Sequence, residues 1–441
     1  MAAVALATML APLNSTMIAV ALPPIMRQYG VGVAETSWLV TGYLIAMASL
    51  QPVAGKLGDR FGRRPLILGG LVYFALASLG AALAPNFALL LCFRLQQGLA
   101  GAVALPNGTA LLREVIPAER RGRRFGLVGS GTALAAASGP PLAGVLVGFI
   151  GWQALFGLNV LVIGPALWLA WRTFPRTGVK AAVSRFDLAG ATLLSVTLIG
   201  LAGLLAGVGS GAWRTLGWVA VAMAAFGWAA VEWRHSDPVV QLRLFARRSY
   251  AAATAAVALS NFAMYVSLLV VPLLLAGQAG GSVLTGLVLT AMSGAMFAGA
   301  PLGGWLADRW GRRRPPLLGF GVLTAGAVTL ALAGGGIHLP VLIGALFLIG
   351  LGVGTASAGL QTSAVESVAG RDAGMAAGVY STCRYIGSIV GSAILAHALG
   401  GPHPTTGAFG LVFTAIAACA ALSWCAALGL EARPAERAAS S

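Results

Sequence analysis

The chain has 441 residues, of which 58% are hydrophobic and only 9% are charged. A soluble globular protein has about 25% charged residues, so this composition excludes a soluble protein and indicates an integral membrane protein. The formal net charge is +16, but the basic residues lie in short clusters between apolar runs rather than in one patch or tail, which argues against nucleic-acid binding. The four cysteines fall within apolar runs with no metal-site or redox-pair spacing, so we expect no metal ion and no cofactor.

Apolar runs of bilayer length follow one another along the whole chain. A membrane-spanning helix needs about 20 apolar residues. On that measure the sequence predicts fourteen helices, at residues 3–23, 36–56, 66–84, 87–111, 125–149, 153–172, 187–207, 215–232, 250–275, 283–304, 316–334, 339–362, 373–398 and 408–429. The first run has no Lys or Arg ahead of it, so we interpret it as a retained span ending at Pro23-Pro24 and not as a signal peptide. The longest connection, 233–249, leaves no room for a soluble domain.

A charged stretch, residues 55–64, separates the second and third predicted helices and reads G-K-L-G-D-R-F-G-R-R. A carboxylate and four cations cannot lie in hydrocarbon, so we expect a tight turn at a membrane face, where glycines let two helix ends approach closely. The pattern recurs at residues 304–314 as G-W-L-A-D-R-W-G-R-R-R. An ordinary basic loop that sets topology would explain one copy. Two copies in equivalent contexts favour a chain built of two homologous halves.

The spacing of the two copies predicts the domain organisation. Asp59 and Asp308 are 249 residues apart, more than six helices and their loops require, and the excess is about one helical hairpin. We therefore expect a six-helix bundle at 1–175, an inserted helix pair with its flanking loops at 176–248, a second six-helix bundle at 249–430, and a tail at 431–441. Most Lys and Arg residues lie in the loops on the side of the two charged stretches, which predicts that both termini are cytoplasmic.

Several further motifs share the pattern of one family. The fourth predicted helix contains Arg94-Leu95-Gln96-Gln97-Gly98, which matches R-x-x-Q-G, and the fifth contains Gly139-Pro140-Pro141-Leu142-Ala143-Gly144, which is similar to G-P-x-x-G-G. With the charged stretches, these motifs resemble the fourteen-helix drug:proton antiporter branch of the major facilitator superfamily. The resemblance covers nearly the whole chain. It implies an all-α membrane protein with the major facilitator fold, two six-helix bundles plus two inserted helices, that works by alternating access.

The resemblance also implies a role for the charged stretches as a conformational latch. Its residues would be Asp59, Arg60, Gly62, Arg63, Arg64, Asp308 and Arg309. In the family, the first aspartate holds the N-terminal end of a helix in the other half, where unpaired N–H groups favour a carboxylate. The alternative from the residues alone is that Asp59 neutralises a neighbouring arginine, a contact worth at most about 1 kcal/mol at the surface. Asp308 would be the weaker counterpart.

Arg94 lies well inside a predicted span. A charge there costs about 2.5–3.5 kcal/mol on insertion scales, so it is expected to face a cavity or a partner. The resemblance implies that Arg94 responds to a proton or substrate, and the alternative is a structural arginine bonded to a carbonyl or water. The same coupling and cavity group contains Asn14, Gln97, Gly98 and Arg384. For Arg384 a purely structural role is an equal alternative.

The fifth helix carries the antiporter motif residues Gly139, Pro140 and Gly144. Proline removes a backbone donor and clashes with the preceding turn, so the Gly139-Pro140-Pro141 run predicts a break in this helix. The alternative is an ordinary kink. The small residues around the run favour close, sliding contact with another helix.

Asn14 departs from the family pattern, because relatives of this branch usually have an acid there. No Asp or Glu lies in the middle of any predicted span. An amide cannot titrate, so the usual coupling site is in question, and proton coupling would have to use an end-of-span carboxylate such as Asp59 or Glu35, or the substrate itself. Aromatic and amide side chains that can line a mostly apolar cavity, or serve in packing, are Tyr43, Asn261, Tyr265, Gln361 and Tyr380.

These features predict an exporter of small amphipathic or hydrophobic compounds across the cytoplasmic membrane, with protons as the exchanged ion, the lipid bilayer as its surroundings, and a monomeric state. A lipid or natural-product exporter and an uncoupled facilitator are the alternatives that Asn14 supports. An enzyme is not expected, because no nucleophile–base set or ligand-spaced pair of histidines occurs in the spans. A sensor built on the same scaffold is a further alternative.

Overall fold

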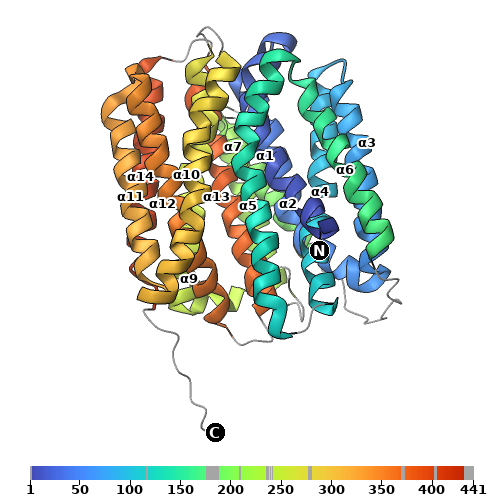
Figure 1. Cartoon of the computed structure of the whole chain (residues 1–441). Helices are drawn as coiled ribbons and strands as arrows, with labels where there is room; N and C mark the ends of the chain where they lie inside the picture. The colour runs from blue at the N-terminus through green and yellow to red at the C-terminus, as the bar shows by residue number, and fades with distance from the viewer. Residues whose placement is uncertain are drawn as a thin grey trace. The chain divides into compact units, whose positions relative to one another are not determined.

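The structure is a computed structural model, and it describes residues 2–115, 118–174, 188–207, 210–234, 238, 240, 242–276, 281–368, 373–401 and 405–431. The described part is all-α (Figure 1). Its α-helices are α1 (Ala2–Tyr29), α2 (Val33–Phe61), α3 (Arg63–Ala82), α4 (Phe87–Val115), α5 (Ala118–Phe149), α6 (Gln153–Thr173), α7 (Leu188–Leu205), α8 (Gly211–Arg234), α9 (Arg248–Leu275), α10 (Gly281–Trp310), α11 (Arg314–Ala333), α12 (Leu339–Glu366), α13 (Ala373–Leu399) and α14 (Thr406–Ala427). Two short 3₁₀ helices, Leu242–Ala246 and Gly334–Gly336, lie in connections.

Each of the fourteen predicted helices has a counterpart in the structure. Eleven of the described helices are long and apolar enough to cross a membrane, and the apolar parts of α5 and α7 are shorter. The all-α prediction is therefore confirmed, whereas the count of fourteen spans stays a prediction.

The end predicted for the first helix is wrong. α1 does not stop at Pro23-Pro24 but continues through both prolines to Tyr29. Helices in membranes tolerate internal proline where neighbours compensate for the lost backbone bond. The stop signal is Gly30, which has a φ of 64°. The amide of Val31 donates to the carbonyl of Met26 at 3.2 Å, the bond expected when a glycine closes a helix in the left-handed conformation.

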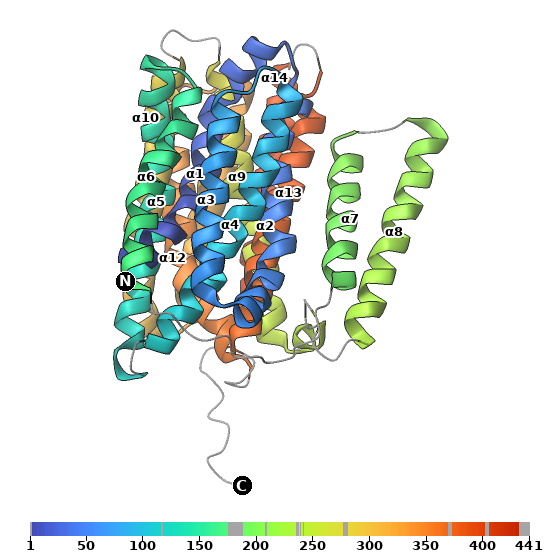
Figure 2. The same cartoon turned by 90° about the vertical axis from the view of Figure 1, so that its right-hand side faces the viewer.

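The chain forms two compact units. Unit 1 comprises residues 1–239 and 272–287, and unit 2 comprises residues 240–271 and 288–441. In unit 1, α1 packs on α5, α6 and α4, while α2 and α3 pack on α4. The hairpin of α7 and α8 contacts the rest of this unit through α2 (Figure 2). The side chains of α8 are largely exposed. In unit 2, α11 packs on α12 and α14, and α12 contacts α13.

Glycines bring helices of unit 2 into backbone contact. A Cβ atom on Gly299 would lie 2.8 Å from the carbonyl oxygen of Leu351, and one on Gly319 would lie 2.6 Å from that of Gly352. These contacts join α10 and α11 to α12. Small residues allow such close packing in membranes, where dispersion forces rather than the hydrophobic effect hold helices together.

The two charged stretches both turn at a glycine with a positive φ directly after a helix. Gly62 alone separates α2 from α3 and has a φ of 91°. Gly311, 249 residues later, follows α10 and has a φ of 79°. Positive φ values are readily adopted only by glycine. The predicted tight turn is therefore confirmed in both units, and the backbone conformation explains why a glycine occupies each turn.

Candidate functional site

The centre of unit 1 is the guanidinium of Arg94, which is fully buried. Its Nε donates to the carbonyl of Leu39 at 3.1 Å, and its Nη1 donates to Oε1 of Gln97 at 2.9 Å. Nη1 also donates to Oδ1 of Asn14, and the guanidinium lies 4.5 Å from the ring centroid of Tyr43. These acceptors are all neutral. The positive charge is therefore solvated by protein dipoles, since none of these groups is a carboxylate.

The spacing of the R-x-x-Q-G motif has a direct geometric explanation. Arg94 and Gln97 are three residues apart, so both project from one face of α4. Gly98 follows at the contact with α2, and a Cβ atom there would lie 2.8 Å from the carbonyl oxygen of Tyr43. The missing side chain lets α4 approach α2, which brings Arg94 within reach of the Leu39 carbonyl.

The hydrogen-bond network extends beyond the residues expected from the sequence. Nε2 of Gln97 donates to Oγ of Ser78 at 2.8 Å, and Nδ2 of Asn159 lies 3.5 Å from the same oxygen. All three side chains are buried. Together with Asn14 and Arg94, they connect α1, α3, α4 and α6. Ser78 carries no sequence signal of its own, because a single serine in an apolar helix has many possible roles.

The run Gly139-Pro140-Pro141 does not break its helix. α5 continues through both prolines from Ala118 to Phe149, so the predicted break is wrong. Pro140 has no N–H group for the carbonyl of Ala136, four residues earlier. That carbonyl accepts a hydrogen bond from Oγ1 of Thr16 on α1 at 3.1 Å. A hydroxyl from a neighbouring helix thus replaces the missing donor, as is known for spanning helices.

The helix-5 glycines lie at close contacts with two other helices. A Cβ atom on Gly139 would lie 3.2 Å from the carbonyl oxygen of Leu13 on α1. A Cβ atom on Gly144 would lie 2.8 Å from Cα of Gly286 on α10, and one on Gly286 would lie 2.9 Å from the carbonyl oxygen of Pro140. Close contact through small residues, which the sequence predicts, is present on both sides of α5. Whether the helices slide there stays a prediction.

The first latch stretch is described only in part, since the side chains of Asp59 and Arg60 lie outside the described residues. Of the remaining members, Arg64 donates through Nη2 to the carbonyl of Trp171 at 2.7 Å. Trp171 lies in the last turn of α6, where carbonyls lack helical partners and the dipole favours a cation. Arg64 therefore ties the turn to α6, and Arg63 is half-buried.

The second latch stretch has different partners. Asp308 is exposed on α10, and no described residue forms an ion pair with it. Arg309 lies over the ring of Trp305 at 4.2 Å. The ion pair of this loop joins Arg312 to Glu366 at the end of α12, and Arg247 donates to the carbonyl of Ser367 next to it. The sequence did not predict these contacts, because Glu366 is 54 residues from Arg312.

The second intramembrane arginine, Arg384, lies in unit 2 on α13. Its guanidinium carbon is 5.3 Å from the ring centroid of Tyr385 and interacts with the hydroxyl of that residue. Tyr265 on α9 and Tyr380 on α13 are also within electrostatic range. We call Arg384, Tyr265, Tyr380 and Tyr385 the tyrosine cluster. Three of its members were predicted as cavity residues, and Tyr385 is an addition.

Packing of α9 on α13 explains the cluster. A Cβ atom on Gly387 would lie 2.9 Å from Cα of Ala258, and one on Gly391 would lie 2.8 Å from Cγ2 of Val266. The hydroxyl of Tyr250 donates to the carbonyl of Ala376 at 2.9 Å. These contacts hold the two helices side by side along several turns, with Tyr265 further along α9 than the level of Arg384 but within its electrostatic range.

The other predicted cavity residues do not join one site. Tyr43 is buried beside Arg94, and its hydroxyl donates to the carbonyl of Ala11 at 3.3 Å. Asn261 is buried and donates to the carbonyl of Val257 on its own helix at 3.0 Å. Gln361 is exposed on α12. The structure thus places the predicted residues in two groups, one in each unit.

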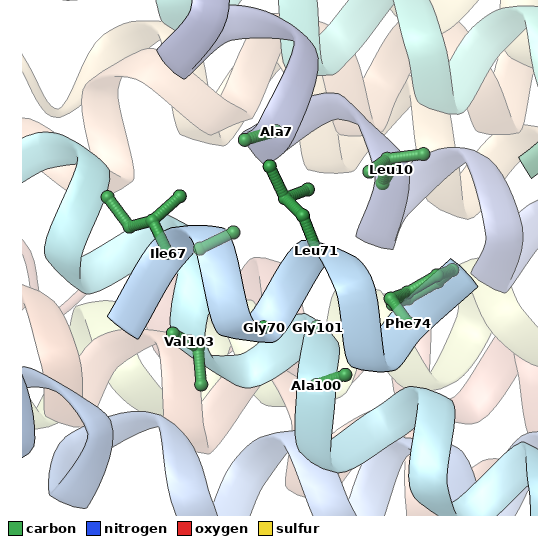
Figure 3. Close-up of a pocket in the computed structure, with 10 residues that line it drawn as sticks. Ala7, Leu10, Ile67, Gly70, Leu71, Phe74, Ala100, Gly101 and Val103 are labelled. Carbon is green, nitrogen blue, oxygen red and sulfur yellow. The ribbon is translucent and has the colours of Figure 1, made fainter. Parts of the chain in front are cut away.

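Unit 1 also contains an apolar crevice between α1, α3 and α4 (Figure 3). Leu71 points from α3 toward Ala7 of α1, and Phe74 lies beside it. The lining has no polar side chain. A small-molecule site usually has a few polar groups that orient its ligand, so we interpret this crevice as packing space and not as the candidate site.

Comparison with known proteins gives consistent results. Residues 4–392 match the model of the Major Facilitator Superfamily. The chain is 33% identical over 392 residues to an uncharacterized MFS-type transporter of Bacillus subtilis, YvkA, with 88% of each chain covered. It is 33% identical over 402 residues to the tetracenomycin C resistance and export protein of Streptomyces glaucescens, covering 89% of this chain and 74% of the relative. It is 33% identical over 403 residues to a multidrug resistance protein B homolog of Mycobacterium tuberculosis, with coverages of 88% and 74%.

Proposed function

Because this chain belongs to the major facilitator superfamily, we propose that it exports small amphipathic or hydrophobic compounds by alternating access, in exchange for protons. It is a multi-pass membrane transporter whose relatives include proteins named for multidrug resistance and antibiotic export. The observation that carries the proposal is the extent of this similarity, which covers nine-tenths of the chain for the tetracenomycin C exporter. We further propose a monomer in the cytoplasmic membrane with both termini in the cytoplasm.

The geometry supports a moving α1. One face of this helix presents Asn14 to the buried Arg94, and another presents Thr16 to the Ala136 carbonyl of α5. A change in the bonding of Arg94 would therefore be transmitted to the helix-5 motif through two residues of α1. Alternating access needs such a connection between a ligand-sensitive group and a helix contact.

Asn14 favours a second candidate, an uncoupled facilitator or an exporter of lipids or natural products. The amide is buried next to Arg94, and its Nδ2 has no hydrogen-bond partner among the described residues. An amide cannot release a proton, so proton exchange would require another group. The end-of-span carboxylates Asp59 and Glu35 are the candidates, and Glu35 accepts a hydrogen bond from the Gly32 amide at 3.0 Å.

Reconstituted protein in liposomes separates these functions. The liposomes would contain a pH-sensitive dye, and neutral antibiotics, cationic dyes and lipids would be added in turn under an imposed proton gradient. Export coupled to protons predicts substrate-dependent proton movement that protein-free liposomes lack. Substrate flux without proton movement would support the uncoupled facilitator, and absence of any flux would count against a transporter of these compounds.

A further inference from the structure

The tyrosine cluster of unit 2 differs from an ordinary structural arginine. Arg384 lies deep in the protein, yet its side chain is only half-buried. A guanidinium within a span is costly to expose to hydrocarbon. Its accessible surface must therefore meet water or a ligand.

Among the described residues, no carboxylate forms an ion pair with Arg384. α9 and α13 contain no Asp or Glu, and the acids nearest to Arg384 in the sequence are Asp372, which precedes α13, and Glu366 at the end of α12. The acids on the other helices of unit 2 are Asp308 and Glu366, which lie at the C-terminal ends of α10 and α12. Glu366 is already paired with Arg312. The interior of unit 2 is thus electropositive at Arg384.

The three tyrosines supply the remainder of a binding surface. Tyr265 and Tyr380 are almost completely buried, with 7% and 6% of their surface exposed, so their rings are held by packing. Rigid aromatic rings offer a flat apolar contact at low entropic cost, and their hydroxyls can donate hydrogen bonds. An arginine presents a planar fork of donors that fits a carboxylate in a bidentate manner.

We infer that the tyrosine cluster is a binding subsite for an organic oxyanion, a carboxylate or phenolate carried on an aromatic frame. Arg384 would pair with the oxygen atoms, and the half-buried ring of Tyr385 would contact the aromatic frame. The inference rests on the proposed export function for its physiological meaning. It refines that function by assigning the substrate's charge to unit 2 and not to the buried Arg94.

Two probes of one shape test the subsite. The full-length protein, purified in nanodiscs, would be titrated at pH 7 with 2-naphthoate, which is anionic, and with 2-naphthamide, its neutral analogue. The parent should bind the anion more tightly by about tenfold, equivalent to about 1.4 kcal/mol. Arg384→Gln should remove this preference and leave naphthamide binding unchanged. Arg384→Lys should retain part of it, because the charge remains without the planar fork.

The controls separate charge from folding. Arg234→Gln removes an exposed cation from the end of α8 and should leave the tenfold preference intact. Tyr385→Phe, which keeps the ring and loses the hydroxyl, provides a second test and should weaken naphthoate binding about two- to threefold, within the range of one neutral hydrogen bond. Each variant would be compared with the parent by size-exclusion profile and melting temperature.

The outcomes are distinct for the subsite and for export. Equal binding of both probes by the parent, a preference that survives in well-folded Arg384→Gln, or saturable binding of neither probe overturns the subsite. Export of neutral compounds by the same preparation would then still support the proposed function. Selective binding of naphthoate that is lost in Arg384→Gln, together with absence of flux, would sustain the subsite and count against export.

Discussion

The two units repeat one loop but treat their intramembrane arginines in opposite ways. Gly62 and Gly311 form equivalent turns with positive φ, 249 residues apart. Arg94, in contrast, is on the fourth helix of unit 1 and is fully buried among neutral acceptors. Arg384 is on α13, the fifth helix of the second set of six, and is half-buried beside tyrosines. The repeat therefore preserves backbone geometry at the membrane face, while the charged interior has diverged.

The difference in burial indicates different roles for the two arginines. A buried guanidinium that donates to acceptors on several helices, as Arg94 does through Nε and Nη1, can hold those helices together and respond when one acceptor changes. A guanidinium with accessible surface and no carboxylate nearby is ready to receive an external anion. On this comparison, we expect the conformational network in unit 1 and the anion-binding surface in unit 2.

The largest effect is expected from replacing Arg94 by Met, which keeps volume but removes every donor. The substitution removes the arginine donor from the Leu39 carbonyl, Gln97 Oε1 and Asn14 Oδ1. A buried acceptor that is left without any donor lowers the folding stability by about 1–3 kcal/mol. We expect loss of transport and a clear fall in melting temperature in detergent. Arg384→Met is the matched comparison and should lower the melting temperature much less. Equal destabilisation by both would remove the distinction between the two arginines.

Asp59→Asn tests the latch with the next largest effect. If Asp59 holds a helix N-terminus, losing its charge should reduce transport about tenfold, within the range of about 1–2 kcal/mol for a well-placed carboxylate at such a site. The basic residues of the loop remain, so membrane insertion should be normal by protease accessibility. Asp308→Asn should have a smaller effect, since Asp308 is exposed. Transport by Asp59→Asn at the parent rate would exclude the latch role.

Asn14→Asp tests the neutrality of the unit 1 network. A carboxylate next to Arg94 would form a buried ion pair and add a titratable group, so we expect better efflux of a quaternary ammonium dye and a steeper dependence on pH. Dye efflux would be followed for the parent and the variant at external pH values of about 5.5 to 8. This range covers the pKa expected for a carboxyl group when burial raises it. The parent should prefer neutral, zwitterionic or anionic compounds. Strong proton-driven dye efflux by the parent, unchanged in the variant, would show that Asn14 does not set selectivity.

The smallest effect is expected at the repeated turns. Gly62→Ala places a side chain at a φ of 91°, a strain of about 1–3 kcal/mol. The matched variant is Gly311→Ala, where φ is 79°. Both should lower the melting temperature by similar amounts, because the two turns share their backbone geometry. A large difference between them would show that the repeat does not extend to the energetics of the turns.

Much of this molecule follows from its sequence. Apolar runs of bilayer length predicted all fourteen helices, because each must satisfy its own backbone hydrogen bonds in lipid. The charged stretches predicted the turns, because neither their charges nor their positive-φ glycines fit within a span. The first helix was predicted too short because proline is a weaker stop signal within a membrane than in water. Gly30 was the informative residue.

The tertiary structure decided how the polar side chains are satisfied. Oγ1 of Thr16 compensates for Pro140 from 124 residues away, and Ser78 and Asn159 join the network of Arg94 from two other helices. Glycines of α13 let α9 pack against it, which brings Tyr265 within electrostatic range of Arg384. Such partners are chosen by helix packing, whereas the sequence pattern of a single helix records only which face is apolar. The sequence thus determined where the helices and turns are, and packing between distant helices determined which arginine is enclosed and which is accessible.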